Sequence, residues 1–286
     1  MNESRLTAPV RALVLGAVAY EPKVVTIWEA FRAHFLAHGL AFDFVLYSSY
    51  ERQVEAHLRG EIDVAWNSPL AWIETERAAR RKGRTAEVIA MRDTDRDLTS
   101  VVLVREGGPV RELADLRGAK IGVGAADSPQ ATLIPLASLA EAGVVGQEVR
   151  HDERAGRHGD HADGERKAVR ALRGGVVDAA CVLDSNRLAF EREGLIAQQG
   201  PAAVRVVHQT APYDRCNFTV LDGAPPETGR FRELLMAMSH ESPAARPLLD
   251  LAGLTAWRPG RTTGYAQLER AVDRYGTLDA WLAHLA

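Results

Sequence analysis

The regular alternation of strand-like apolar runs with helical segments limits what this chain can fold into. Residues 10–18 form a continuous apolar run, which is typical of a parallel strand buried on both faces. Residues 22–38 follow with helical spacing, which places Val25, Trp28 and Phe31 on one side, and Gly39 suits a C-terminal cap. Repetition of this unit favours an α/β architecture with mainly parallel sheets.

The same pattern continues to the end of the chain, and a second series of units begins after residues 107–109. The polar, histidine-rich residues 151–164 predict a loop. The expected strands are residues 10–18, 42–47, 62–66, 87–92, 100–105, 120–123, 176–183, 204–207 and 218–221. The expected helices are residues 22–38, 50–58, 70–81, 110–116, 129–142 and 165–173, with further helices up to residue 286.

Composition and charge narrow the classes of function. The chain has 286 residues, 46% of them hydrophobic, which is enough for two domains with cores of their own. The formal net charge is −3 and no basic stripe stands out, so we expect no nucleic-acid partner. The basic residues 77–84 are interpreted as a solvated helix end. Cys181 and Cys216 lie in apolar, strand-like stretches, which predicts two buried thiols.

The first apolar run has two interpretations. Residues 12–19 follow Arg5 and Arg11 and loosely imitate a secretory signal. They fit equally well as the first buried strand, and cleavage after Ala19 would leave the sheet incomplete. We therefore expect a cytoplasmic location for the chain as it stands, and a periplasmic or extracellular one if it has been trimmed. No stretch approaches the ~20 apolar residues of a membrane span, so none is expected.

Three segments carry a resemblance to a known family. Residues 50–72 (YERQVEAHLRGEIDVAWNSPLAW) combine an aromatic, a short helix, a G-x-x-D sequence and a loop that closes on a proline. Residues 113–143 begin LADLRGAK and continue through a serine-containing loop into a helix with an internal proline. Residues 159–184 contain GDH, a helix and GGVVDAA. In this order the segments resemble the phosphate/phosphite/phosphonate-type substrate-binding proteins of ABC transporters.

That resemblance implies a two-lobed, type II periplasmic-binding-protein fold with a two-strand hinge. The first lobe would be discontinuous, residues 1–98 and 209–286, and residues 99–208 would form an inserted second lobe. A small polar ligand, expected to be an anion such as a phosphonate, phosphate or carboxylate, would be captured in the cleft between the lobes. An ABC permease is the protein partner that this family implies, and no cofactor is expected.

The turn before the helix at Pro129 is the best local signal for an anion site. Ser128 suits an N-cap and Pro129 suits the first helical position. The amides of Gln130 and Ala131 would then face the ligand, aided by the helix dipole. An ordinary helix cap is the alternative. Asp127 departs from the family pattern and would repel a dianion, so a monoanion or a ligand with an amine fits this turn better.

His161 matches the family's ligand-facing histidine after a glycine, and as an imidazolium it would donate to an oxyanion. The surrounding segment is dense in histidine and carboxylates. A metal site there, with candidates His158, Asp160 and His161, is an alternative to a solvated polar loop, and we expect no metal.

Other candidate ligand residues lie at strand ends or loop starts, which face the crevice in open α/β sheets. Asp184 follows a predicted strand. Its carboxylate would either contact an amine of the ligand or interact with His161. Trp66 and Trp72 would either stack on a ligand or fill the core, and the core is favoured. The remaining candidates are Tyr20, Tyr50, Asn67, Ser68, Thr99, Ser100 and Tyr213.

Capture of a ligand without chemistry is the leading hypothesis, because no nucleophile–base pair and no G-x-S-x-G, H-E-x-x-H or P-loop motif occurs. One alternative is a cytoplasmic lyase or dehydratase on the same fold, with His161, Asp184 and Asp127 as acid–base candidates. Another is a sensory domain that reports ligand occupancy to a partner. Fold analogy alone does not separate them.

Overall fold

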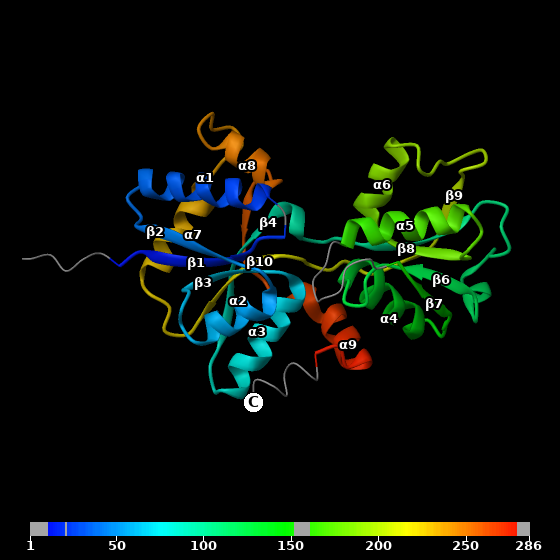
Figure 1. Cartoon of the computed structure of the whole chain (residues 1–286), viewed down its shortest axis with the longest axis horizontal. Coiled ribbons are helices and arrows are strands. Elements are labelled where there is room, and N and C mark those ends of the chain that lie inside the picture. Colours follow the sequence, from blue (N-terminus) through cyan, green and yellow to red (C-terminus); the bar gives the residue numbers. More distant parts are fainter. Residues whose placement is uncertain (1–10, 21, 152–160, 279–286) are drawn as a thin grey trace, which may run out of the picture. The chain divides into compact units, whose positions relative to one another are not determined.

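The computed structural model describes residues 11–20, 22–151 and 161–278, and it divides into two compact units. Unit 1 comprises Met1–Thr94 and Cys216–Arg261, and unit 2 comprises Asp95–Arg215 and Thr262–Ala286 (Figure 1). The sequence expectation had placed the C-terminal segment in the first lobe. It groups with unit 2 because the Tyr265 hydroxyl donates to the Arg215 carbonyl at 2.7 Å, and Gln267 Nε2 donates to the Pro212 carbonyl at 2.8 Å.

Unit 1 is built on a six-stranded sheet of order β11-β4-β10-β3-β1-β2. Its strands are β1 (Leu13–Val18), β2 (Phe42–Tyr47), β3 (Val64–Asn67), β4 (Ala86–Arg92), β10 (Asn217–Leu221) and β11 (Trp257–Pro259). Its helices are α1 (Lys23–Ala37), α2 (Tyr50–Leu58), α3 (Pro69–Arg81), α7 (Glu227–Ala237) and α8 (Arg246–Ala252). In Figure 1, α1, α7 and α8 lie on one face of the sheet, and α2 and α3 lie on the other.

The core of unit 1 is rich in aromatic side chains. Helix α1 contributes Val24, Trp28, Phe31 and Phe35, which pack against β-strand residues and against α7 and α8. The sequence analysis had placed Val25 on this face, but its side chain is exposed, because the buried stripe begins one residue earlier. The apolar run near the N-terminus forms β1, as predicted for a buried strand.

Unit 2 is built on a five-stranded sheet of order β7-β6-β8-β5-β9. Its strands are β5 (Ser100–Arg105), β6 (Lys120–Val123), β7 (Gln147–Arg150), β8 (Ala179–Leu183) and β9 (Val204–Gln209). Its helices are α4 (Ile134–Glu141), α5 (His161–Arg173), α6 (Asp184–Arg192) and α9 (Ala266–Tyr275), with short helical turns at Leu113–Leu116, Pro129–Leu133 and Thr263–Tyr265.

The sheet of unit 2 separates two apolar cores. One core packs Val169 and Leu172 of α5 and Phe190 of α6 against the sheet, and the other packs Leu139 of α4 against it. Both cysteines of the chain are buried thiols, as predicted, and burial raises the pKa of Cys181 to about 12. The Cys181 thiol is therefore not a ready nucleophile or metal ligand.

The α/β class is confirmed, but the expectation of mainly parallel sheets is wrong in detail. Among the described strands, four pairings are parallel and five are antiparallel. The antiparallel pairings all involve β5, β9, β10 or β11, strands that enter their sheets from distant parts of the chain. Pairing direction at such strands depends on long-range connections, which hydrophobic periodicity does not report.

Several element bounds differ from the expected ones. Helix α6 was not predicted, α5 begins inside the segment expected to be a loop, and the helix expected at 110–116 is a short turn at Leu113–Leu116. The helix expected at 129–142 starts as a π-helical turn, Pro129–Leu133, before α4 begins. Within the described residues, none of the helices has the length and apolarity needed to cross a bilayer.

Candidate functional site

The carboxyl edge of the unit 2 sheet brings several predicted site residues together. Strands β6 and β8 run parallel and end at this edge. Strand β5 is antiparallel to β8, so its first residue, Ser100, lies opposite the last residue of β8, Leu183. The turn that follows β6 and the start of α6 therefore lie at the same edge, which is where open α/β sheets place their ligand sites.

Ser100, Gln130 and Tyr213 form a buried hydrogen-bonded group at this edge. Ser100 Oγ donates to the Gln130 carbonyl at 2.6 Å and lies 2.6 Å from the Tyr213 hydroxyl. Because the serine has a single hydroxyl proton, Tyr213 is the donor in the second bond. Burial raises the pKa of Tyr213, which keeps this phenol protonated. Three residues predicted from separate segments of the sequence thus meet in one network.

Glu165 extends this network, and the sequence analysis did not identify it as a site residue. Its Oε2 accepts from the Leu183 amide at 2.9 Å and from Asn186 Nδ2 at 3.0 Å, and its Oε1 accepts from Gln130 Nε2 at 3.3 Å. The side chain is fully buried, and burial raises its pKa although the three hydrogen bonds oppose the shift. Its position on the apolar face of α5 was a usable signal, since an isolated buried carboxyl needs partners.

The turn before Pro129 has the predicted cap. Ser128 Oγ accepts from the Ala131 amide at 3.2 Å, and Ser128 and Ala131 are both buried. That amide, which we expected to face a ligand, therefore donates within the turn. Gly124 allows the close packing, because a Cβ there would lie 3.0 Å from the Ala131 side chain. Whether Ser128, Gln130 and Ala131 contact a ligand stays a prediction.

Thr132 adds an unsatisfied group to the same turn. Its side chain is 3% exposed, and within the described part of the chain its hydroxyl has no hydrogen-bond partner. Buried hydroxyls in proteins are normally paired, so this one retains hydrogen-bonding capacity. Thr132 was not predicted, because the expected anion site used only the amides of the first two residues after Pro129.

Thr99 and Asp184 have local partners in unit 2. Thr99 Oγ1 accepts from Gln209 Nε2 at 3.0 Å, and Arg187 Nε donates to Asp184 at 2.6 Å. Asp184 is the first residue of α6, where a carboxylate is favoured by the helix dipole. These contacts give both residues structural roles, and their predicted ligand contacts stay predictions.

The predicted metal candidates are only partly within the described structure. His158 and Asp160 lie outside the described residues. His161 is the first residue of α5, but its side chain is not among those that the structure describes. Among the side chains that are described, no cluster of three or more histidine, cysteine or acidic residues forms a metal site.

In unit 1, the candidates also lie at the carboxyl edge of the sheet. Asn67 ends β3 and is fully buried, where it accepts from Gln53 Nε2 at 2.8 Å and donates to Thr219 Oγ1 at 2.9 Å. Ser68 caps α3 by accepting from the Ala71 amide at 3.2 Å. Tyr50 is the buried first residue of α2, whereas Tyr20 is 56% exposed. Of these four, Tyr20 alone is among the residues that line one pocket in the described part of unit 1.

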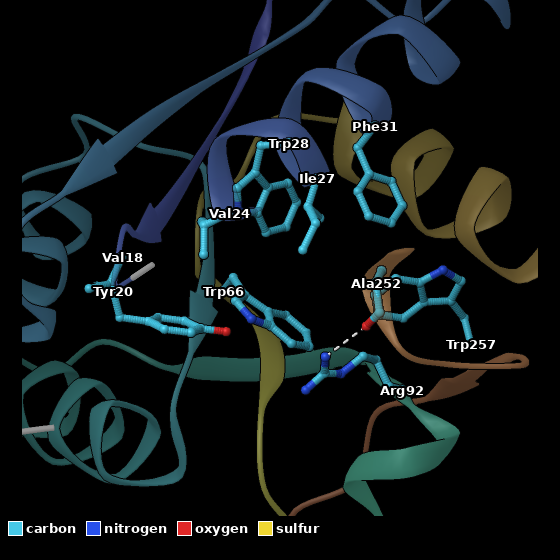
Figure 2. A pocket seen from close by; sticks show the side chains of 10 residues that line it. All are labelled: Val18, Tyr20, Val24, Ile27, Trp28, Phe31, Trp66, Arg92, Ala252 and Trp257. Carbon is cyan, nitrogen blue, oxygen red and sulfur yellow. Dashed lines mark hydrogen bonds between the residues drawn. The ribbon is translucent and has the colours of Figure 1, made fainter. Parts of the chain in front are cut away.

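That pocket lies beside α1 and is mostly aromatic (Figure 2). Arg92, the last residue of β4, lies at its lower side with the guanidinium carbon 5.1 Å from the centre of the Trp66 ring. Trp72, by contrast, is a buried core residue of α3, as favoured from the sequence. The aromatic lining side chains are Tyr20, Trp28, Phe31, Trp66 and Trp257.

Comparison with solved structures places this fold among binding proteins. The Prochlorococcus marinus protein PhnD1, solved with methylphosphonate, is 15% identical with a TM-score of 0.65, covering 93% of this chain and 98% of that one. A Xanthomonas citri protein bound to chloride is 19% identical with a TM-score of 0.67, covering 92% and 99%. The periplasmic aliphatic sulphonate binding protein of Escherichia coli is 18% identical with a TM-score of 0.55, covering 93% and 92%.

At these identities the structures show the fold, which is the expected type II periplasmic-binding-protein fold. No curated protein matches the sequence. The model of one protein family matches residues 16–265, and that family is described as the phosphonate periplasmic substrate-binding protein of an ABC transporter. These comparisons support the solute-binding interpretation and not the enzyme alternative. The chain therefore belongs to the phosphonate-type periplasmic substrate-binding proteins of ABC transporters.

Proposed function

We propose that this protein captures a small oxyanion through the carboxyl edge of unit 2 and delivers it to an ABC permease. The observation that carries the proposal is the buried, unpartnered hydroxyl of Thr132 in a turn that Ser128 caps. A bound oxyanion would accept from this hydroxyl and so satisfy a group that otherwise costs about 1–3 kcal/mol. The relatives solved with methylphosphonate and chloride support an anionic ligand.

The charge at the turn favours a particular kind of anion. Asp127 is buried next to Ser128, and a carboxylate beside the site disfavours a second concentrated negative charge. A monoanion such as a sulfonate, a carboxylate or a singly ionised phosphonate is therefore a better ligand than a dianion, and an amine on the ligand would be tolerated. The predicted contacts from Gln130 and His161 belong to this proposal.

A permease and an ATPase would complete the transport system. The family is described as periplasmic, and that location suits a protein that hands a solute to a membrane permease. The cytoplasmic location expected from the sequence has no observation in its favour here. A binding role also needs no catalytic group, in keeping with the absence of a nucleophile–base motif from the sequence.

Calorimetric titration with methylphosphonate, phosphate, phosphite, ethanesulfonate and acetate tests the proposal. We expect at least one of these anions to bind, and a ligand at a hundredfold excess over its Kd to raise stability by about 2.7 kcal/mol. Thr132→Val removes the hydroxyl at nearly constant volume and should weaken binding about tenfold, equivalent to ~1.4 kcal/mol.

Thr228→Val is the matched control, because the Thr228 hydroxyl donates to the Pro225 carbonyl at the start of α7 in unit 1. It should leave anion affinity unchanged. The proposal fails if none of the anions binds the unmodified protein. The assignment to the Ser128 turn fails if both threonine variants bind the anion as well as the unmodified protein does.

A further inference from the structure

Glu165 is a fully buried carboxyl group at the edge of the unit 2 sheet to which the anion is assigned. Its hydrogen-bond donors are the Leu183 amide, Asn186 Nδ2 and Gln130 Nε2. Among the described residues, none of these donors belongs to a lysine or an arginine, so no directly bonded cation neutralises the carboxylate. A buried carboxyl in such surroundings is readily protonated, because burial disfavours its charged form.

Two contacts bring Glu165 to the turn that carries the unpartnered hydroxyl of Thr132. Gln130, which donates to Glu165, lies two residues before Thr132 in the same helical turn. Gly164 packs on the backbone that leads into this turn, since a Cβ at Gly164 would lie 3.2 Å from the Gly124 Cα. An anion that accepts from the Thr132 hydroxyl would therefore share a buried region with the Glu165 carboxyl.

The charges around Glu165 do not cancel its own. Burial raises its pKa, and its hydrogen bonds and the charge of Arg215 lower it by less. The buried thiol and phenol nearby have raised pKa values and stay neutral. Asp184 is paired with Arg187, and Asp127 adds a buried carboxyl in the turn. The charged and titratable groups on the segments around the start of α5 are Asp127, His151, Cys181, Asp184, Arg187, Tyr213 and Arg215.

The hydrogen bonds of Glu165 leave one oxygen suited to carry a proton. Oε2 accepts from Leu183 at 2.9 Å and from Asn186 at 3.0 Å, and the carbonyl oxygen of a protonated carboxyl keeps both bonds because it has two lone pairs. Oε1 accepts from Gln130 alone, at 3.3 Å. Once protonated, Oε1 becomes a donor, and half a turn of the Gln130 amide presents its oxygen as the acceptor. Protonation therefore costs no buried hydrogen bond.

We propose that Glu165 takes up a proton when the anion binds, so that capture of the anion and protonation of this carboxyl favour each other. The proton comes from solvent and forms the Oε1–H bond, and no other covalent bond changes. The physical reason is that two negative charges in one buried region repel, and neutralisation of Glu165 removes this repulsion. The coupling rests on the proposed function and makes anion affinity rise as the pH falls.

Calorimetric titration of the full chain with ethanesulfonate tests the coupling. A sulfonate keeps a single charge between about pH 8 and pH 5, so any dependence on pH in this range comes from the protein. Titrations in bis-tris and in imidazole, at equal chloride concentration, give the number of protons taken up from the difference in binding enthalpy. We expect uptake of up to one proton per anion and an affinity about 10-fold higher at the lower pH.

Three variants assign the proton. Glu165→Gln imitates the protonated carboxyl, so at about pH 8 it should bind ethanesulfonate roughly 10-fold more tightly than the unmodified protein, with equal enthalpy in both buffers. Glu193→Gln alters an exposed carboxylate of unit 2 and should keep both the proton uptake and the pH dependence. Asn186→Ala removes a donor that favours ionised Glu165, so affinity should rise at a higher pH. It carries the test if Glu165→Gln does not fold.

Binding without proton uptake, and with equal affinity at the two pH values, would overturn the coupling and leave the proposed function intact. Uptake that persists in Glu165→Gln would overturn the assignment to Glu165. If ethanesulfonate does not bind, methylphosphonate replaces it, and the difference between the unmodified protein and Glu165→Gln removes the contribution of the phosphonate's own ionisation. If neither anion binds at either pH, the proposed function and the coupling both fail.

Discussion

The two sheets of this protein present opposite chemistry at equivalent edges. At the carboxyl edge of the unit 1 sheet lies a pocket of aromatic rings with one cation, Arg92. At the carboxyl edge of the unit 2 sheet lies a buried network of a carboxyl, hydroxyls and amides that includes Glu165, Ser100 and Tyr213. The same strand–helix architecture thus supplies a position for a site, and the side chains placed there determine what it binds.

The comparison also concerns stability. The aromatic pocket at the unit 1 edge is held mainly by apolar burial, which changes little with pH. The unit 2 edge depends on hydrogen bonds to a buried carboxyl, and such a group is costly when its partners are removed. Substitutions at the two edges should therefore lower the free energy of unfolding by different amounts.

Glu165→Ala should give the largest loss of stability. It leaves the Leu183 amide and the Asn186 side chain, both now hydrogen-bonded to Oε2, without that acceptor inside the protein. At about 1–3 kcal/mol for each unpaired donor, we expect the free energy of unfolding to fall by roughly 4 kcal/mol. Urea denaturation measures the loss, and hydrogen exchange should show faster exchange in residues 179–192.

Glu193→Ala is the matched control for this variant. Glu193 is an exposed carboxylate paired with Arg166, and exposed ion pairs contribute little to stability. Glu165→Gln, which keeps one acceptor oxygen, should fall between the two. If Glu165→Ala costs no more than Glu193→Ala, the unit 2 network does not stabilise this edge.

The two units should respond in opposite directions to acid. His57 of α2 in unit 1 is buried, and burial lowers its pKa from 6.5 to about 4. The unfolded chain therefore binds more protons between these values, so unit 1 should lose up to roughly 3 kcal/mol as the pH falls from 6.5 to 4. The pKa of Glu165 in unit 2 is raised from 4.5, so its contribution to stability grows as the pH falls toward 4.5.

Hydrogen exchange of peptides from each unit, corrected for the intrinsic effect of pH on exchange, separates the two responses. His57→Gln removes the titrating group and should flatten the pH dependence of unit 1 without changing that of unit 2. Equal pH dependence of the two units in the unmodified protein would contradict the assignment of the acid response to His57.

The sequence predicted the class of fold well, because the signals it needs are local. The continuous apolar run of β1 and the helical spacing of α1 are both contained in short windows. Even there, a single-residue error placed Val25 rather than Val24 in the core. The mixed direction of the sheets was missed, since β10 lies between β3 and β4 and reaches them only after residues 93–216, which include the whole sheet of unit 2.

The candidate site was predicted only in part, for a related reason. Ser100 and Tyr213 were selected as polar residues at a strand end or loop, and Gln130 for its backbone amide at a helix start; the structure adds that Ser100 is hydrogen-bonded to both of the others. The aromatic pocket was missed because Trp66 and Trp257 come from segments far apart in the sequence and look like core residues. Only the fold brings them beside Arg92.

Arg92→Met should give the smallest effect, and it tests whether the charge at the unit 1 edge has a structural role. Methionine keeps an unbranched apolar side chain but removes the cation over Trp66 and the bond to the Ala252 carbonyl. An exposed or half-buried cation–π contact contributes about 0.5–1 kcal/mol and the hydrogen bond about as much, so we expect a loss of roughly 1–2 kcal/mol in urea denaturation.

Arg258→Met, on the exposed side of β11, is the control and should have almost no effect. If the two variants lose equal stability, Arg92 is not needed to hold the α8–β11 connection. Because the loss expected here is smaller than that at Glu165, a larger one would show that the aromatic edge depends on polar contacts as strongly as the unit 2 edge does.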